Sequence, residues 1–142
     1  MKMNEVTVSD WVYLGTQRSN MGGDYDVFFK AQKLTLDDLK FWADNDWDDW
    51  VFDEFIKPIP LTEEFFEKNG FVLNNSFYPL YKKYENEDKR IMITDEANSG
   101  DGYWYVHVDN EDYDTIGGCD VKYVHQFQQL LRLCGYEMDV VV

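Results

Sequence analysis

The chain has 142 residues, a formal net charge of −15, and 44% hydrophobic residues, with 18% of all residues aromatic. This length can bury a core without disulfides or metals, and the composition argues against disorder. The charge disfavours direct binding to nucleic acid or to anionic membranes, because affinity for phosphate comes from Lys and Arg. It permits a basic protein partner or a cation, and solubility alone also accounts for it.

Cysteine usage and the lack of apolar runs indicate a cytoplasmic protein. Cys119 and Cys134 are too few for a disulfide framework or a zinc site. We expect two reduced thiols, with a bridge between them as the open alternative. Residues 1–5 lack a signal-peptide core, and no segment approaches the roughly 18 apolar residues that a membrane span needs.

The first third of the chain predicts two strands and a short helix. Residues 5–14 and 25–33 are rich in β-forming side chains. Thr35 and Asp38 have the spacing of a capping box, which predicts a helix over 36–43.

The following segment predicts a short strand and a second short helix. Residues 51–56 are β-forming, and Pro58 and Pro60 should hold the chain extended. Thr62 has the character of an N-cap, and Gly70 is expected to follow the end of that helix.

The middle of the chain predicts an antiparallel meander separated by Asn-rich and Gly-rich turns. The expected strands cover residues 71–73, 77–84, 89–94 and 103–109. In the last of these, alternation places two sets of side chains on opposite faces. The sets are Trp104, Val106 and Val108 against Tyr103, Tyr105 and His107.

The C-terminal part predicts the longest helix and a docked tail. Asp120 is expected to cap a helix over 121–134, which Gly135 ends. The apolar end of 137–142 predicts a final docked strand. The pattern predicts an α+β fold in one domain, residues 1–142: a bent antiparallel sheet with the C-terminal helix packed on it and two short helices.

Three acidic segments have the oxygen ligands of a cation site but lack its motif. In 44–49, Asp49 stands where a calcium loop needs Gly, and Phe55 stands where it needs a bidentate Glu. The segment 95–101 has Ala97 at a ligand position, and 109–114 matches no motif. We interpret all three as solvated turns and predict neither a metal nor a cofactor.

Catalytic signatures are equally weak, and we predict a non-enzymatic protein with no catalytic residues. The chain has two histidines, His107 in an expected strand and His125 in the expected long helix, and no nucleophile motif accompanies them. Carboxylates that converge with His107 only in the fold leave a metal-assisted hydrolase as the least favoured alternative.

Most of the negative charge lies in two stretches, and the first also contains tryptophans. Residues 37–54 carry eight carboxylates against Lys40, and residues 95–120 carry eight with no Lys or Arg. Aromatic anchors among carboxylates suit a basic protein surface. The predicted partner-binding residues are Trp42, Asp44, Asp46, Trp47, Asp48, Asp49 and Trp50. Equally, these tryptophans can fold back into the core.

A second hypothesis is a small-molecule binder, for example a sponge for a nucleotide immune signal. Aromatic rings would stack on a base, and the Gly117–Gly118 turn before the long helix would meet a phosphate. The candidate residues are Tyr103, Trp104, Tyr105, His107, Gly117, Gly118, Lys82 and Arg90. The net charge counts against this alternative.

Five segments together resemble a family of small uncharacterised proteins from gut bacteria, their prophages and mobile elements. These segments are 1–5, 10–12, 58–64, 68–71 and 120–128. The stretch 15–57 departs from that family. The resemblance implies a cytoplasmic protein from a mobile element, and by context a host-protein partner and an inhibitor of host defence. It supplies no site residues. A homo-oligomer is compatible with all of these expectations.

Overall fold

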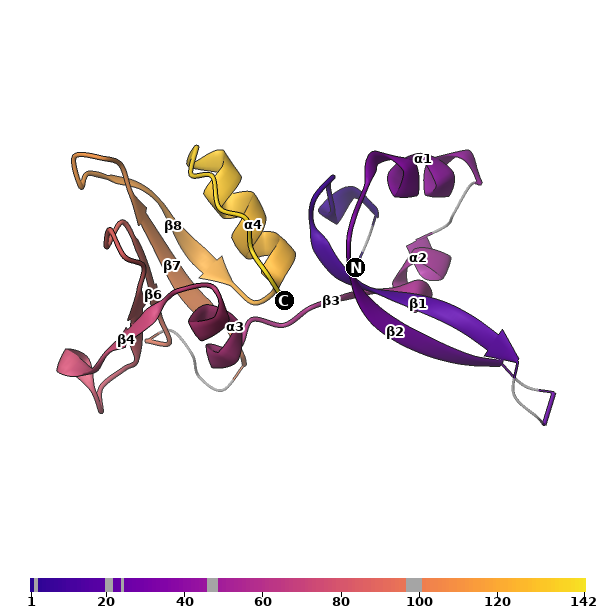
Figure 1. The fold of residues 1–142 in the computed structure, drawn as a ribbon, viewed down its shortest axis with the longest axis horizontal. Coiled ribbons are helices and arrows are strands. Elements are labelled where there is room, and N and C mark those ends of the chain that lie inside the picture. The colour runs from indigo at the N-terminus through magenta and orange to yellow at the C-terminus, as the bar shows by residue number, and fades with distance from the viewer. Residues whose placement is uncertain (2, 20–21, 24, 46–48, 97–100) are drawn as a thin grey trace. The chain divides into compact units, whose positions relative to one another are not determined.

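The computed structural model describes residues 1, 3–19, 22–23, 25–45, 49–96 and 101–142. Their contacts form two compact units, Met1–Ile59 and Pro60–Val142, and each contains its own antiparallel sheet (Figure 1). The predicted α+β class with a C-terminal helix and further short helices is confirmed, although two sheets replace the single bent sheet that we expected.

The sheet of the first unit is a long hairpin with one short added strand. β1 (Trp11–Ser19) lies between β2 (Tyr25–Lys33) and β3 (Ile56–Pro58), in the order β2-β1-β3. The prediction of β2 is confirmed, whereas the predicted strand over 5–14 is wrong over most of its length. Asp10 explains the difference, because its buried carboxylate accepts the Thr7 N–H at 2.8 Å and closes a turn just before β1.

Two short helices complete the first unit. α1 (Leu36–Asp44) begins at the predicted capping box, in which Thr35 and Asp38 bond reciprocally. α2 (Asp49–Phe55) occupies most of the segment for which we predicted a strand, so that prediction is wrong. Tertiary packing favours the helix: Phe52 is fully buried and meets the Trp42 ring edge-on at 5.3 Å. The buried core of this unit consists of Val6, Val12, Leu34, Trp42, Phe52 and Ile56.

The sheet of the second unit is a meander in which every strand pairs with its neighbour in sequence. Its order is β4 (Val72–Asn74), β5 (Lys83–Glu85), β6 (Ile91–Thr94), β7 (Trp104–Asp109) and β8 (Thr115–Val121). The predicted strand over 77–84 is wrong over most of its length, because a 3₁₀ turn over Asn75–Phe77 precedes it and β5 starts only at Lys83.

β8 was not predicted, and it changes the role of the Gly117–Gly118 pair. Glycine is depleted in strands, so this pair indicated a turn. The structure instead places both glycines inside β8, with Gly117 opposite Val108 and Gly118 opposite His107. The predicted turn is therefore wrong, and with it the anion site before the long helix.

The helices of the second unit cover the buried face of its sheet (Figure 1). α3 (Glu63–Lys68) has the predicted Thr62 cap, and α4 (Val124–Leu133) starts three residues later than predicted, because β8 continues to Val121. Phe66 on α3 is fully buried and contacts Trp104 on β7 with their ring centroids 4.9 Å apart. Phe127 on α4 packs on the same aromatic cluster.

The C-terminal tail is docked by a side chain rather than by a strand. The Asn69 amide donates to the Val141 carbonyl and accepts the Val141 N–H, both at 2.8 Å. Val140 beside it is buried. The prediction of a docked tail is confirmed, and the prediction of a strand there is wrong.

Candidate functional site

The face of β7 away from the core carries two of the predicted ligand-binding residues. Trp104, Val106 and Val108 are buried, whereas Tyr105 is 38% exposed and His107 is half-buried, so the predicted alternation is confirmed. The register places Tyr105 opposite Asp120 and His107 opposite Gly118 on β8.

The Tyr105 ring lies against the backbone of β8 at Gly118. A Cβ atom on Gly118 would lie 2.5 Å from the Tyr105 hydroxyl oxygen and 3.1 Å from the adjoining ring carbon. A side chain at this position would therefore displace the ring. The glycine holds the Tyr105 hydroxyl close to the backbone of β8 and fixes where this exposed ring lies.

A polar cluster of His107, Asp109 and Thr115 lies at the end of the β7–β8 hairpin. The His107 Nε2 atom is 2.7 Å from Asp109 Oδ1 and 3.2 Å from Thr115 Oγ1. In an acid–base triad the two partners bond to opposite ring nitrogens, whereas here both meet the same nitrogen. The cluster sits where the register shifts between Val108 and Asp109, so it stabilises the bulge at the hairpin end.

The acidic turn that joins β7 to β8 is closed by Asn110. The Asn110 side-chain oxygen accepts the N–H groups of Asp112 and Asp114, both at 2.9 Å. This is the Asx-turn geometry expected of a turn-forming Asn, and it occupies the amide oxygen that a cation would need. The turn carries an exposed aromatic ring, since Tyr113 is 61% exposed.

We define the acidic hairpin surface as the exposed apolar, aromatic and carboxylate residues within 103–120, which cover β7, the turn after it and β8 up to Asp120. Its members are Tyr103, Tyr105, Glu111, Asp112, Tyr113, Asp114, Ile116 and Asp120. The sequence between Arg90 and Lys122 contains no Lys or Arg. The hairpin itself therefore supplies no cation to neutralise these carboxylates, and four exposed apolar or aromatic side chains lie among them.

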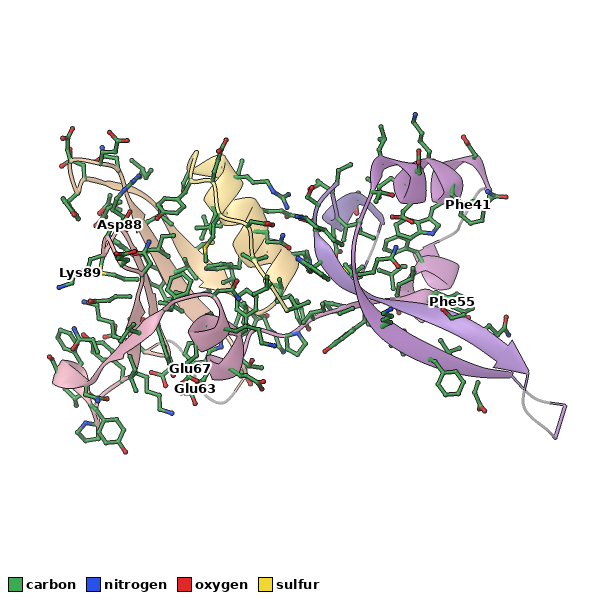
Figure 2. All side chains as sticks on the ribbon, viewed as in Figure 1. Phe41, Phe55, Glu63, Glu67, Asp88 and Lys89 are labelled. Atoms are coloured by element: carbon green, nitrogen blue, oxygen red, sulfur yellow. The ribbon has the colours of Figure 1, made fainter. Side chains whose placement is uncertain are left out.

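The predicted partner-binding residues of the first unit do not form one exposed group in the described structure. Trp42 is 3% exposed and belongs to the core, while Asp44 is exposed at the end of α1. Asp46, Trp47 and Asp48 lie outside the described residues, as do the side chains of Asp49 and Trp50. The exposed ring of α1 is that of Phe41, at 56% exposure (Figure 2). We did not predict Phe41 as a surface residue, because helical periodicity alone does not show which apolar neighbour faces the core.

The remaining ligand-binding candidates have structural roles. Trp104 is in the core, and Gly117 lies against Cys134, whose Sγ would be 2.5 Å from an added Cβ. The Lys82 ammonium pairs with Glu63 at 2.6 Å, and this carboxylate raises the pKa of Lys82. Arg90 stacks on a tyrosine ring in a separate network. Only Tyr103, Tyr105, His107 and Gly118 remain near one another along the hairpin.

That separate network surrounds a cleft of about 530 Å³ beside the β5–β6 turn. Asn86 donates to the Tyr136 hydroxyl at 2.8 Å, and this hydroxyl donates to Asp88 at 3.1 Å (Asp88 is labelled in Figure 2). The Arg90 guanidinium lies 4.9 Å from the centroid of the Tyr136 ring. Burial and the Asp88 carboxylate raise the pKa of Tyr136, so the phenol stays a donor. These polar groups bond to one another and tie the segment after α4 to the sheet.

β5, next to the edge strand β4, carries one further charge pair. The Lys83 ammonium is 3.0 Å from Glu85, and Asn74 donates to the same carboxylate at 3.3 Å. Burial acts to raise the pKa of Glu85, but these two hydrogen bonds outweigh it and lower the pKa below its ordinary value.

The described residues contain no group of three or more His, Cys, Asp or Glu side chains placed to hold a metal ion. No helix within the described ranges is long and apolar enough to cross a membrane. Both cysteines are free thiols, and burial raises the pKa of each. No family model, no curated protein and no solved structure shows a significant match to the chain.

Proposed function

We propose that this chain is a non-enzymatic binding protein that engages a basic protein through the acidic hairpin surface. The observation that carries the proposal is the mixture of exposed Tyr and Ile side chains with carboxylates on one hairpin. Aromatic side chains are the commonest anchors of protein interfaces, and a surface of one charge sign steers a partner of the opposite sign.

The hairpin has an exposed aromatic ring, whereas the one tryptophan of the stretch 42–50 whose side chain the structure describes is buried. Trp42 packs inside a core, so its ring is not offered to a partner. In contrast, Tyr113 is 61% exposed on a turn that Asn110 closes. An aromatic side chain on such a turn loses less conformational entropy on binding than one on a loop without internal hydrogen bonds.

A nucleotide ligand fits the same surface less well. Phosphate recognition needs cations, and Lys82 and Arg90 are engaged with Glu63 and Tyr136. Lys122, whose ammonium is 5.3 Å from the Tyr103 ring centroid, also borders the hairpin. The protein-binding hypothesis therefore has the better support. The resemblance to mobile-element proteins adds the proposal that the partner is a host protein and that binding blunts host defence.

The test compares capture of host proteins by two charge-matched variants. One variant neutralises Glu111, Asp112 and Asp114 on the hairpin, and the control neutralises Asp37, Glu54 and Glu67, which are exposed elsewhere. We expect the hairpin variant to lose a basic partner that the control retains. The affinity of the retained partner should fall with added salt, because its attraction is between exposed charges.

Two results would contradict the proposal. Equal capture by both variants would show that the hairpin carboxylates do not contribute. A nucleotide-sized mass that copurifies with the wild-type chain, and is lost on Tyr105→Ala, would favour the small-molecule alternative.

A further inference from the structure

β2 forms an edge of the first sheet and has the features of a strand that accepts another strand. It makes nine consecutive pairs with β1 without a bulge. No strand of the described chain pairs with its other edge. Natural edge strands of this length usually carry charged side chains, a proline, a bulge or a cover that limits pairing. β2 contains neither proline nor bulge, and its charged residues are Asp26, Lys30 and Lys33. Phe28 and Phe29 near its middle are 52% and 43% exposed.

The sequence of β2 is complementary to itself in one antiparallel register. In an antiparallel pair, two residues that face each other either both point their backbone N–H and C=O groups toward the partner strand or both point them away from it. Along β2 these two orientations alternate from one residue to the next. In a β2–β2 pair, the numbers of two facing residues must therefore add to an even number. Centring the pair on Phe28 places Asp26 opposite Lys30 of the second copy, twice by symmetry. Centring it on Phe29 places Phe28 opposite Lys30, and centring it on Val27 places Asp26 opposite Phe28. Of these three registers, only the Phe28 register pairs opposite charges between residues of β2 (Tyr25–Lys33).

The two faces of the sheet also agree with this register. Asp26, Phe28 and Lys30 alternate with Val27 and Phe29, so their side chains lie on opposite faces. On one face, the Phe28 rings of the two copies meet between the flanking charge pairs. On the other face, Val27 of each copy meets Phe29. Aromatic and opposite-charge cross-strand pairs both stabilise antiparallel sheets.

We propose that β2 pairs with β2 of a second copy of this chain in the Phe28 register, which forms a two-fold symmetric dimer with a continuous six-stranded sheet. The occupant is a second copy because one strand supplies both members of each charge pair, as a self-complementary two-fold interface requires. The inference concerns the first unit and does not depend on the proposed function of the acidic hairpin surface.

The decisive experiment reverses one charge at a time and then mixes the variants. Asp26→Lys places two lysines opposite each other, and Lys30→Asp places two aspartates opposite each other. We expect each variant alone to weaken dimerisation at least about tenfold, since each converts two attractive pairs into two repulsive ones. Mixed together, the two variants should form a heterodimer, because each facing pair again joins Lys to Asp. Sedimentation velocity at about 100 μM chain detects dimers in the micromolar range.

Lys33→Asp is the matched control, because position 33 is outside the paired segment 26–30 and its reversal should leave the dimer intact. Phe28→Glu should give a monomer with an unchanged circular dichroism spectrum. A wild-type chain that stays monomeric at this concentration would overturn the proposal. So would a dimer that the single reversals do not weaken, or variants that fail to associate when they are mixed.

Discussion

Replacing Gly117 with Ala should loosen the packing of α4 on β8, because the new methyl group has no room. Its carbon would lie 2.5 Å from Cys134 Sγ, whereas non-bonded heavy atoms prefer about 3.5–4.0 Å. Forcing extra atoms into a packed site costs about 1–3 kcal/mol. Replacing a strand glycine recovers about 0.5–1 kcal/mol of chain entropy. We therefore expect a net loss of about 1–2 kcal/mol in the free energy of unfolding of the second unit.

The second substitution of this test removes the atom that clashes. Cys134→Ala deletes the sulfur and should by itself cost about 1 kcal/mol or less, because the residue is only half-buried. In the double variant the methyl group of residue 117 takes the space of the sulfur. The loss for Gly117→Ala plus Cys134→Ala should therefore be smaller than the sum of the single losses, by about 1 kcal/mol or more.

The assay must report on the second unit specifically. Of the five tryptophans, only Trp104 belongs to that unit, so intrinsic fluorescence is dominated by the first. Hydrogen exchange followed by mass spectrometry resolves peptides from α4 and β8 separately. Gly117→Ala should lower the protection of α4, and the double variant should restore it. A single variant with wild-type protection, or a double variant no better than the single, would refute the packing argument.

Three further predictions concern the contacts around the tail and the meander edge. Tyr136→Phe removes the hydroxyl that donates to Asp88 at 3.1 Å and should cost about 1 kcal/mol of stability in urea unfolding. Asn69→Ala removes both bonds to Val141, so limited proteolysis should release the last residues of the chain faster than in the wild type. The lowered pKa of Glu85 contributes stability that is fully present above the ordinary glutamate value of about 4.3 and is lost as pH falls through the lowered value. Glu85→Gln should therefore reduce the loss of stability on acidification.

Each of these predictions has its own control. Tyr113→Phe removes a tyrosine hydroxyl that donates to a backbone carbonyl on an exposed turn, and it should cost less than Tyr136→Phe. Equal cleavage of Asn69→Ala and the wild-type chain would show that the tail is held by Val140 burial alone. An acid transition unchanged by Glu85→Gln would show that other carboxylates determine it.

Sequence reasoning succeeded where the signal is local. The capping box of Thr35 and Asp38 involves residues three positions apart, so the start of α1 followed directly from the sequence. The alternation of β7 was equally accessible, because burial on one face repeats every second residue. This pattern predicted that one face of β7 is buried and the other exposed, and hence that Tyr105 is exposed.

It failed where contacts distant in sequence decide the structure. α2 contains β-forming residues, and its helical state depends on packing such as that between Phe52 and Trp42. We did not predict β8, because glycine is typical of turns. Its glycines are explained by Cys134 and Tyr105, whose side chains leave no room for a Cβ atom at positions 117 and 118. The prediction of one domain rests on the lack of a linker composition in the chain, and it stays a prediction. The contacts divide between Ile59 and Pro60, inside a short segment that the prolines keep extended.

The candidate site was partly predictable. Tyr105 and His107 were identified, but the pairing of His107 with Asp109 and Thr115 depends on a bulge that leaves no sequence signal. Trp42 and Trp104 were assigned to binding because exposure cannot be judged from residue type. Their burial removes one aromatic anchor from each predicted site, whereas Trp47 and the side chain of Trp50 lie outside the described residues.

The strand order also bears on how the chain acquires its structure. In the second unit each of β4 to β8 pairs with the strand next to it in sequence, so every hairpin can close over a short loop. In the first unit β3 pairs with β1 only after α1 and α2 have been traversed. Loop-closure entropy makes such a pairing later and slower. The meander should thus reach its native register sooner than the first sheet, although the first sheet begins closer to the N-terminus.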